Sequence, residues 1–129
     1  GAYRAEEVWR CLKSGGVFLT QQVGSRNDRE LAELLLPGTP EPFPEQTLAR
    51  QREVFEKAGF TVLRGEEAFG PIRFFDVGAL VWFARVIPWE FPGFSVEGCF
   101  DRLLLAQQEL EARGEIGGTT HRFLLMARK

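Results

Sequence analysis

The stretch "LKSGGVFLTQQVGSRND", Leu12 to Asp28, decides how this chain is organised. Apolar residues recur at helical spacing over the preceding residues 3–12, and the Gly15–Gly16 pair stands where a helix would end and the backbone turn. Residues 17–23 then form a dense apolar run, which is typical of a strand covered on both faces, as in a parallel sheet. The order of helix, glycine turn and strand predicts half of an α/β repeat.

Composition limits the classes of protein to which the chain can belong. With 129 residues, 44% of them hydrophobic, we expect one domain spanning residues 1–129. A formal net charge of -2 provides no basic field for phosphate backbones, so nucleic acid is disfavoured as a partner. Cys11 and Cys99 lie far apart and outside any zinc-ligand spacing, so we expect reduced thiols and no metal. Without a membrane-spanning run or a secretion signal, we expect a cytoplasmic protein with no membrane partner.

Apolar spacing and breaker residues continue the alternation after the first strand. Asn27 is placed to cap a short helix that ends at Leu36. Residues 37–45 contain four of the seven prolines, which predicts a surface loop. Helical spacing resumes over residues 47–58, and Gly59 stands where that helix would end.

Two further extended segments follow. A strand is expected to begin at residues 60–63, and the Gly70–Pro71 dipeptide predicts a turn into a second extended piece. The last element, residues 121–128, carries an unbroken apolar run that suits an interior strand better than a solvated edge.

Two more helices are expected between these strands. Asp76 is placed to cap a helix that Pro88 ends, and Ser95 is placed to cap a longer helix that runs to about Arg113. In the second of these helices, the expected inward-facing residues are Phe100, Leu103, Leu104 and Leu110. Helices and strands alternate for much of the chain, which predicts an α/β layered fold.

Three segments of the chain resemble one known family. The segment "EEVWRCLKSGGVFLTQQV" resembles the helix, turn and fifth strand of class I, Rossmann-like, S-adenosylmethionine-dependent methyltransferases, with Ser14 at the usual proline position. The segment "FEKAGFTVLRGEEAF" is similar to the next helix and the sixth strand. "HRFLLMARK" is similar to the antiparallel seventh strand, which in that family lies between the fifth and sixth. The resemblance implies a partial Rossmann-like methyltransferase sheet with flanking helices.

The resemblance covers only the C-terminal half of such a domain. The family holds its cofactor on a glycine-rich turn after the first strand, and no G-x-G-x-G occurs in this sequence. We therefore expect the residues that bind S-adenosylmethionine to lie outside this chain, in a preceding part of a longer protein. The chain would contribute the side that binds the methyl acceptor, which we expect to be a small molecule. It would be inactive alone, and we assign it no catalytic residue.

Candidate acceptor-binding residues lie in two places. The loop side of the first strand presents Gln21, Gln22, Arg26 and Asn27, since ligands of open α/β sheets gather at the carboxyl ends of strands. The alternative is a solvated loop with Asn27 as a helix cap. Aromatic residues around the link at residues 88–94 include Trp82 and Trp89, which are candidates for lining the acceptor site. Ordinary core packing is the alternative there.

Other ionisable residues allow both a structural and a functional interpretation. Arg85 and Glu90 lie beside the aromatic residues of this region and could bind a polar substrate, although a surface position would explain them equally. His121, the one histidine, stands at the start of a strand, where a structural role is favoured over that of a general base. Glu66 and Glu67 alternate along a strand, so their carboxylates should point to opposite faces and not act as a pair.

A second hypothesis from another class stays open. The chain could be a self-contained α+β binding or protein-interaction domain that docks a partner through the aromatic link and its longest helix. If the chain is instead a truncated methyltransferase, the strand at residues 17–23 would have been paired with a neighbour that is missing. Because an uncovered strand edge tends to recruit another chain, we expect a homodimer through that edge.

Overall fold

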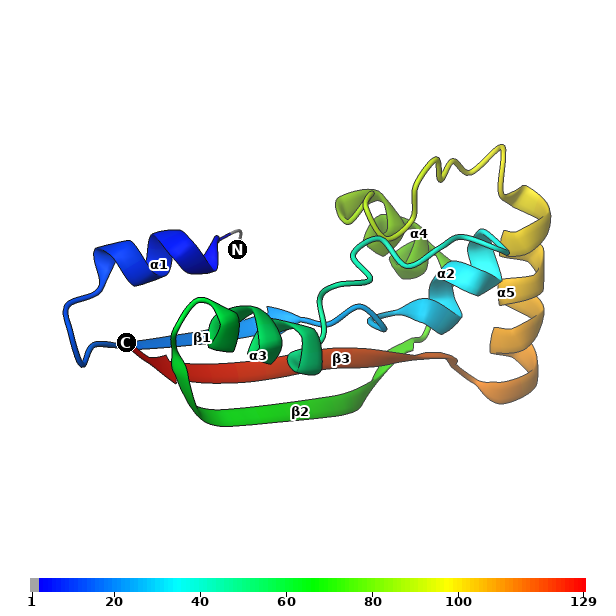
Figure 1. Cartoon of the computed structure of the whole chain (residues 1–129). Coiled ribbons are helices and arrows are strands. Elements are labelled where there is room, and N and C mark those ends of the chain that lie inside the picture. The colour runs from blue at the N-terminus through cyan, green and yellow to red at the C-terminus, as the bar shows by residue number, and fades with distance from the viewer. Residues whose placement is uncertain (1–2) are drawn as a thin grey trace. The chain divides into compact units, whose positions relative to one another are not determined.

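The computed structural model describes residues 3–129 and has an α/β architecture (Figure 1). Within these residues three strands form one open antiparallel sheet, accompanied by five helices. In chain order the elements are α1 (Ala5–Cys11), β1 (Val17–Val23), α2 (Arg29–Leu35), α3 (Leu48–Lys57), β2 (Thr61–Phe74), α4 (Val77–Val86), α5 (Phe100–Arg113) and β3 (Ile116–Arg128). The expected α/β class is confirmed.

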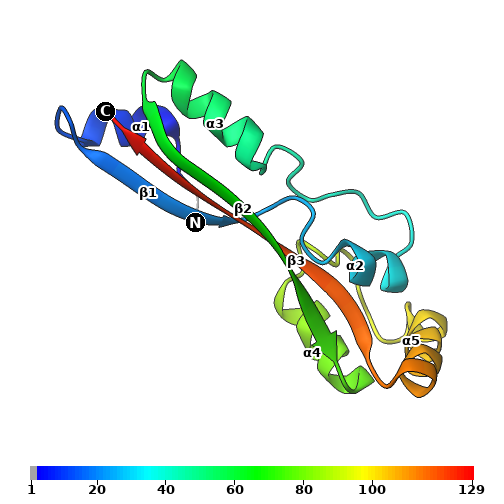
Figure 2. The ribbon, with the colours of Figure 1, turned by 90° about the horizontal axis from the view of Figure 1, so that it is seen from below.

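The last strand lies in the middle of the sheet. The strand order is β1-β3-β2, and Figure 2 shows β3 between the other two strands. β1 and β3 are antiparallel, in a register that places Val17 opposite Arg128 and Val23 opposite Arg122. The apolar run within β3 is therefore in an interior strand, as its lack of alternation predicts.

Contacts between Cα atoms group the chain into two compact units. The first contains the described residues up to Ser25 together with Phe43–Phe69 and His121–Lys129. The second contains Arg26–Pro42 and Gly70–Thr120. β2 and β3 supply residues to both units. The expectation of a single domain stays a prediction.

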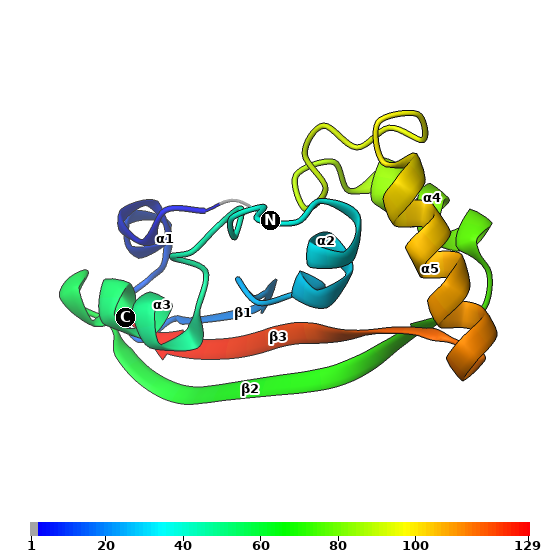
Figure 3. The same cartoon turned by 90° about the vertical axis from the view of Figure 1, so that its right-hand side faces the viewer.

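In the first unit, α1 and α3 cover the same face of the sheet (Figure 3). Phe55 of α3 is fully buried and stacks on Phe18 of β1, with ring centroids 5.7 Å apart and planes 10° from parallel. Leu125 and Ala127 of β3 lie beneath, in the same apolar cluster as Ala5 of α1. These contacts hold both helices on the sheet through burial of apolar area.

The opposite face of β1 is exposed. Val17, Leu19 and Val23 have 46%, 56% and 45% of their surface exposed, whereas Thr20 on the covered face is buried. The expectation that this strand is covered on both faces is therefore wrong within the described residues. The reason is that α1 and α3 pack in one cluster on one face and leave the alternate side chains of the strand outside.

Lys129 binds the C-terminal end of α1. Its Nζ donates to the carbonyl oxygens of Trp9 at 2.6 Å and Leu12 at 2.8 Å, and lies 5.0 Å from the centroid of the Trp9 ring. The last carbonyls of a helix lack partners within the helix and carry its negative dipole end, so an ammonium group there is stabilising.

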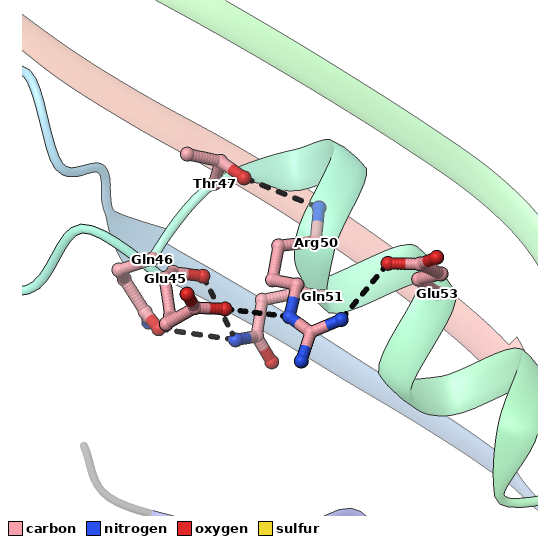
Figure 4. Close-up of polar contacts among 6 residues, drawn as sticks. All are labelled: Glu45, Gln46, Thr47, Arg50, Gln51 and Glu53. Atoms are coloured by element: carbon pink, nitrogen blue, oxygen red, sulfur yellow. Dashed lines mark hydrogen bonds and ion pairs between the residues drawn. The ribbon is translucent and has the colours of Figure 1, made fainter.

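A group of polar side chains fixes the start of α3 (Figure 4). Thr47 is the N-cap, and its side-chain oxygen accepts from the backbone N–H of Arg50 at 3.1 Å. The Arg50 guanidinium bridges Glu45 at 2.5 Å and Glu53 at 3.0 Å. The helix expected over residues 47–58 is thus confirmed, and its cap fixes the end of the preceding loop.

In the second unit, α5 packs against α2 and α4. The core contains Leu31, Leu35, Phe74, Leu80, Phe91, Leu103, Ala106 and Ile116. Arg102 adds a polar tie, since its Nε donates to the carbonyl of Leu34 at 2.7 Å. Asp76 caps α4 as expected, because its carboxylate accepts from the backbone N–H of Ala79 at 2.7 Å.

Two expectations for this part of the chain are wrong. The Gly70–Pro71 dipeptide makes no turn, since β2 is continuous from Thr61 to Phe74. β2 is an edge strand, and an edge tolerates a residue that cannot donate to a ladder. The long helix begins at Phe100, because Ser95 instead holds a separate turn through a bond from the N–H of Gly98 to its hydroxyl.

The inward face of α5 also differs from the expected one. Leu103 is buried, together with Ala106, which lies one turn further along. Phe100 and Leu104 are 54% and 48% exposed, so the buried stripe is narrower than the apolar spacing predicts. None of the helices in the described part of the chain has the length and apolarity needed to cross a membrane.

Candidate functional site

Three polar side chains of the second unit meet in its interior. Asn27 Nδ2 donates to Asp28 Oδ2 at 2.8 Å and to Glu90 Oε1 at 2.9 Å. All three residues are buried, with exposed fractions of 7%, 1% and 6%. Burial of a carboxylate costs free energy unless the carboxylate is hydrogen-bonded, so two buried carboxylates side by side are uncommon in a protein interior. We call it the Asn27–Asp28–Glu90 cluster.

The backbone around Asp28 has an uncommon conformation. Asp28 has φ 57° and ψ 24°, and among the described residues it is the one position other than glycine with positive φ. Its N–H donates to the carbonyl of Thr119 at 2.9 Å. The Glu30 carboxylate also accepts two hydrogen bonds from Thr119, one from its N–H at 3.0 Å and one from its hydroxyl at 2.6 Å. These bonds to Thr119 keep the loop in its left-handed form.

Asn27 does not cap α2, so that interpretation is wrong. Asp28 occupies the N-cap position of the helix, and its side chain makes no cap bond. Asn27 instead directs its amide to a carboxylate 63 positions away in the chain. Its nitrogen donates to two carboxylates, which the cap interpretation could not anticipate.

Glu90 is held by the irregular link after α4. Its N–H donates to the carbonyl of Ile87 at 3.0 Å, and the neighbouring Phe91 is fully buried in the core of the unit. Glu90 Oε2 has no hydrogen-bond partner among the described residues, whereas Oε1 accepts from Asn27. The interpretation of Glu90 as a surface residue is wrong. Its carboxylate keeps acceptor capacity for an N–H or O–H group.

The two glutamines predicted as site residues lie in the first unit and point to opposite faces of β1. Gln21 is exposed on the outer face. Gln22 donates to Thr20 Oγ1 at 2.7 Å and accepts from Gln46 Nε2 at 3.3 Å. Gln51 Nε2 continues this chain of bonds to Gln46 Oε1 at 3.3 Å. The polar groups of Gln22 are therefore used to tie β1 to the loop before α3.

The other predicted site residues lie in the second unit. Arg26 is exposed beside Asn27 in sequence. Trp82, on α4, and Trp89, next to Glu90, are 66% and 53% exposed. The core-packing alternative for these two tryptophans therefore does not hold in the described structure. Their role in binding an acceptor stays a prediction.

His121 is buried in the first unit. Its ring stacks on Phe69 at a centroid distance of 4.4 Å, and its Nε2 lies 3.5 Å from Glu67 Oε1. Its carbonyl accepts from the N–H of Gly24 at 2.8 Å. An imidazole held between a ring, a carboxylate and a glycine backbone is in keeping with a structural role.

Sequence reasoning missed Asp28 and did not choose Glu90. One signal was available, since Glu90 is the single carboxylate inside an aromatic and proline-rich link. Within the described residues, no group of three or more His, Cys, Asp or Glu side chains is placed to hold a metal ion. In comparisons with known proteins, no family model matches the chain and no curated protein is significantly similar to it.

Proposed function

We propose that this chain is the C-terminal part of a class I S-adenosylmethionine-dependent methyltransferase and supplies the side that binds the methyl acceptor. The observation that carries the proposal is the strand order β1-β3-β2, with the C-terminal strand antiparallel in the middle. The family to which three segments are similar places its fifth, seventh and sixth strands in this order. A shared order of three strands supports a fold relationship, and the chemistry rests on the site.

The connection between β1 and β2 also supports the proposal. Both strands are antiparallel to β3 and therefore parallel to each other, and α2 and α3 lie between them in the chain. A helical crossover between parallel strands is the unit from which Rossmann-like sheets are built. In the proposal, the cofactor-binding half of the sheet would continue beyond the open edge of β1.

The Asn27–Asp28–Glu90 cluster is the proposed acceptor site. Asn27 and Asp28 belong to the loop that follows the carboxyl end of β1, where open α/β sheets bind ligands. Glu90 Oε2 is buried, so a small acceptor would reach it only after the surrounding side chains moved apart, and would then donate an N–H or O–H group to it. Methyl transfer depends mainly on in-line positioning of the nucleophile, and a fixed carboxylate supplies such positioning.

Calorimetry with S-adenosylmethionine tests the division between two halves. The 129-residue chain should show no binding, whereas a protein extended by its upstream coding sequence should bind at micromolar concentration. Micromolar binding by the 129-residue chain would contradict the proposed division. An extended protein that binds no S-adenosylmethionine would instead favour the self-contained binding domain.

Two matched variants of the extended protein test the acceptor site. Glu90→Gln keeps the size of the side chain but replaces a carboxylate oxygen with an amide nitrogen. With an acceptor found by screening small molecules for methylation, the rate of methyl transfer should fall about ten-fold or more. Glu97→Gln changes an exposed carboxylate seven positions along the chain and should leave the rate unchanged. Equal rates for the two variants would remove Glu90 from the proposed site.

A further inference from the structure

The backbone groups on one side of β1 are left open. The Lys129 N–H donates to the Gly16 carbonyl, and the Gly24 N–H donates to the His121 carbonyl, so even-numbered residues bond across to β3. Hydrogen-bonded pairs alternate along an antiparallel ladder. The N–H and C=O groups of the odd-numbered residues therefore point away from β3. Because β1 is at the edge of the sheet, no strand among the described residues pairs with them.

The sequence of β1 contains none of the devices that protect an edge. Its seven residues, VFLTQQV, include no charged side chain and no proline, and its register with β3 runs without a bulge. The odd-numbered residues that face the open edge also carry the exposed side chains Val17, Leu19, Gln21 and Val23. An uncharged, unbulged edge of this length is a template for another strand.

We propose that a second copy of this chain pairs with β1 as an antiparallel strand across a two-fold axis at Thr20. In this register Val17 faces Val23 of the second copy, and Leu19 faces its Gln21. All the odd-numbered residues then form hydrogen-bonded pairs, about eight bonds in total. The pairing joins two three-stranded sheets into one.

The symmetry of the strand favours a second copy as the occupant. Valine stands at both ends of β1, so the two-fold register brings apolar side chains together at each end. Since the strand carries no charge, the register opposes no like charges. The inference goes beyond the methyltransferase proposal, because it rests on the geometry of β1 in the 129-residue chain. In the longer protein of that proposal, the preceding half of the sheet would occupy the same edge, so two copies would pair there only where that half is absent.

Disulfide trapping tests the register. Thr20 would face its own copy in a non-hydrogen-bonded pair, where Cα atoms lie about 4.5 Å apart, within the span of a disulfide. In a Cys11→Ser background, which removes the exposed native thiol, Thr20→Cys should give covalent dimers on mild oxidation. Val17→Cys is the control, since the two copies of residue 17 would lie roughly 20 Å apart. The yield should be about ten-fold higher for Thr20→Cys.

A second variant tests the open hydrogen bonds without a disulfide. Gln21→Pro removes one N–H that faces the open edge and none that bonds to β3, whereas Gln21→Ala keeps that N–H. Sedimentation velocity should give a dissociation constant about ten-fold higher for Gln21→Pro than for Gln21→Ala. A chain that stays monomeric up to millimolar concentration would overturn the inference. Equal trapping of Thr20→Cys and Val17→Cys would overturn it too.

Discussion

A Cβ atom added to Gly24 would lie 2.2 Å from Nδ1 of the buried His121. The imidazole thus occupies the space that any side chain at position 24 would need. Because the Gly24 N–H also donates to the His121 carbonyl, the backbone of Gly24 has little freedom to move away. The pair joins the end of β1 to the first residue of the β3 segment in the first unit.

Gly24→Ala should therefore destabilise the chain. Overpacking of a buried site costs about 1–3 kcal/mol in the free energy of unfolding, which urea denaturation would measure. Gly117→Ala is the matched control, since a Cβ there meets nothing within 4 Å and its φ is not positive. If both variants unfold at the same urea concentration, the close packing of His121 on Gly24 is not present in solution.

Removal of the Glu90 carboxylate should also lower stability. Glu90→Ala leaves the buried Asn27 amide without one of its acceptors, which costs about 1–3 kcal/mol in the free energy of unfolding. Glu90→Gln retains a carbonyl oxygen at the same reach and should cost less. Thermal unfolding followed by circular dichroism would rank the variants, and an alanine variant as stable as the parent would contradict a buried bond.

Burial raises the pKa of Tyr3 above its ordinary value of 10.0. The folded state then holds the phenolic proton more tightly than the unfolded state does. The resulting stability is complete below the unfolded pKa and is lost as the pH rises through the folded pKa. Since the chain has one tyrosine, absorbance of the phenolate at alkaline pH titrates this group alone. Tyr3→Phe should abolish this contribution, and an ordinary tyrosine titration in the folded chain would refute it.

Lys129→Met should loosen α1. The substitution keeps an apolar stem but removes the charged donor from the carbonyls of Trp9 and Leu12, at a cost of about 1–2 kcal/mol. Amide hydrogen exchange should become faster in α1 and stay unchanged in α5. Lys13→Met removes an exposed ammonium group near the same helix and serves as the control. Equal exchange rates in the two variants would show that Lys129 does not hold the helix.

The parts of the fold that depend on neighbouring residues could be predicted from the sequence. The bounds of β1 follow from an apolar run between glycines, and the start of α4 follows from the cap residue Asp76. The interior position of β3 follows from its unbroken apolar run. Each of these signals acts within a few residues, so no knowledge of the tertiary structure was needed.

The predictions are wrong at positions whose conformation or contacts depend on residues far away in the sequence. Asn27 is a residue type that often caps helices, but its side-chain amide donates to Glu90. The two residues lie far apart in the sequence, so no local pattern indicates this hydrogen bond. The Gly70–Pro71 dipeptide is typical of turns, but it lies within the edge strand β2, where a proline without an N–H need not break the ladder. For the same reason the candidate site was half predicted, with Asn27 named and its two carboxylate partners not chosen.

The central place of the C-terminal strand has a consequence for biosynthesis. β1 and β2 each neighbour β3 and not one another, so among the described residues a nascent chain that has exposed both of them has no strand pair to form. These three strands can form their sheet only after β3 has been synthesised, because β3 is the strand that pairs with both of the others. Until then β1, which carries no charged residue, has no partner strand among the described residues, and such unpaired strands are prone to associate with other chains during folding.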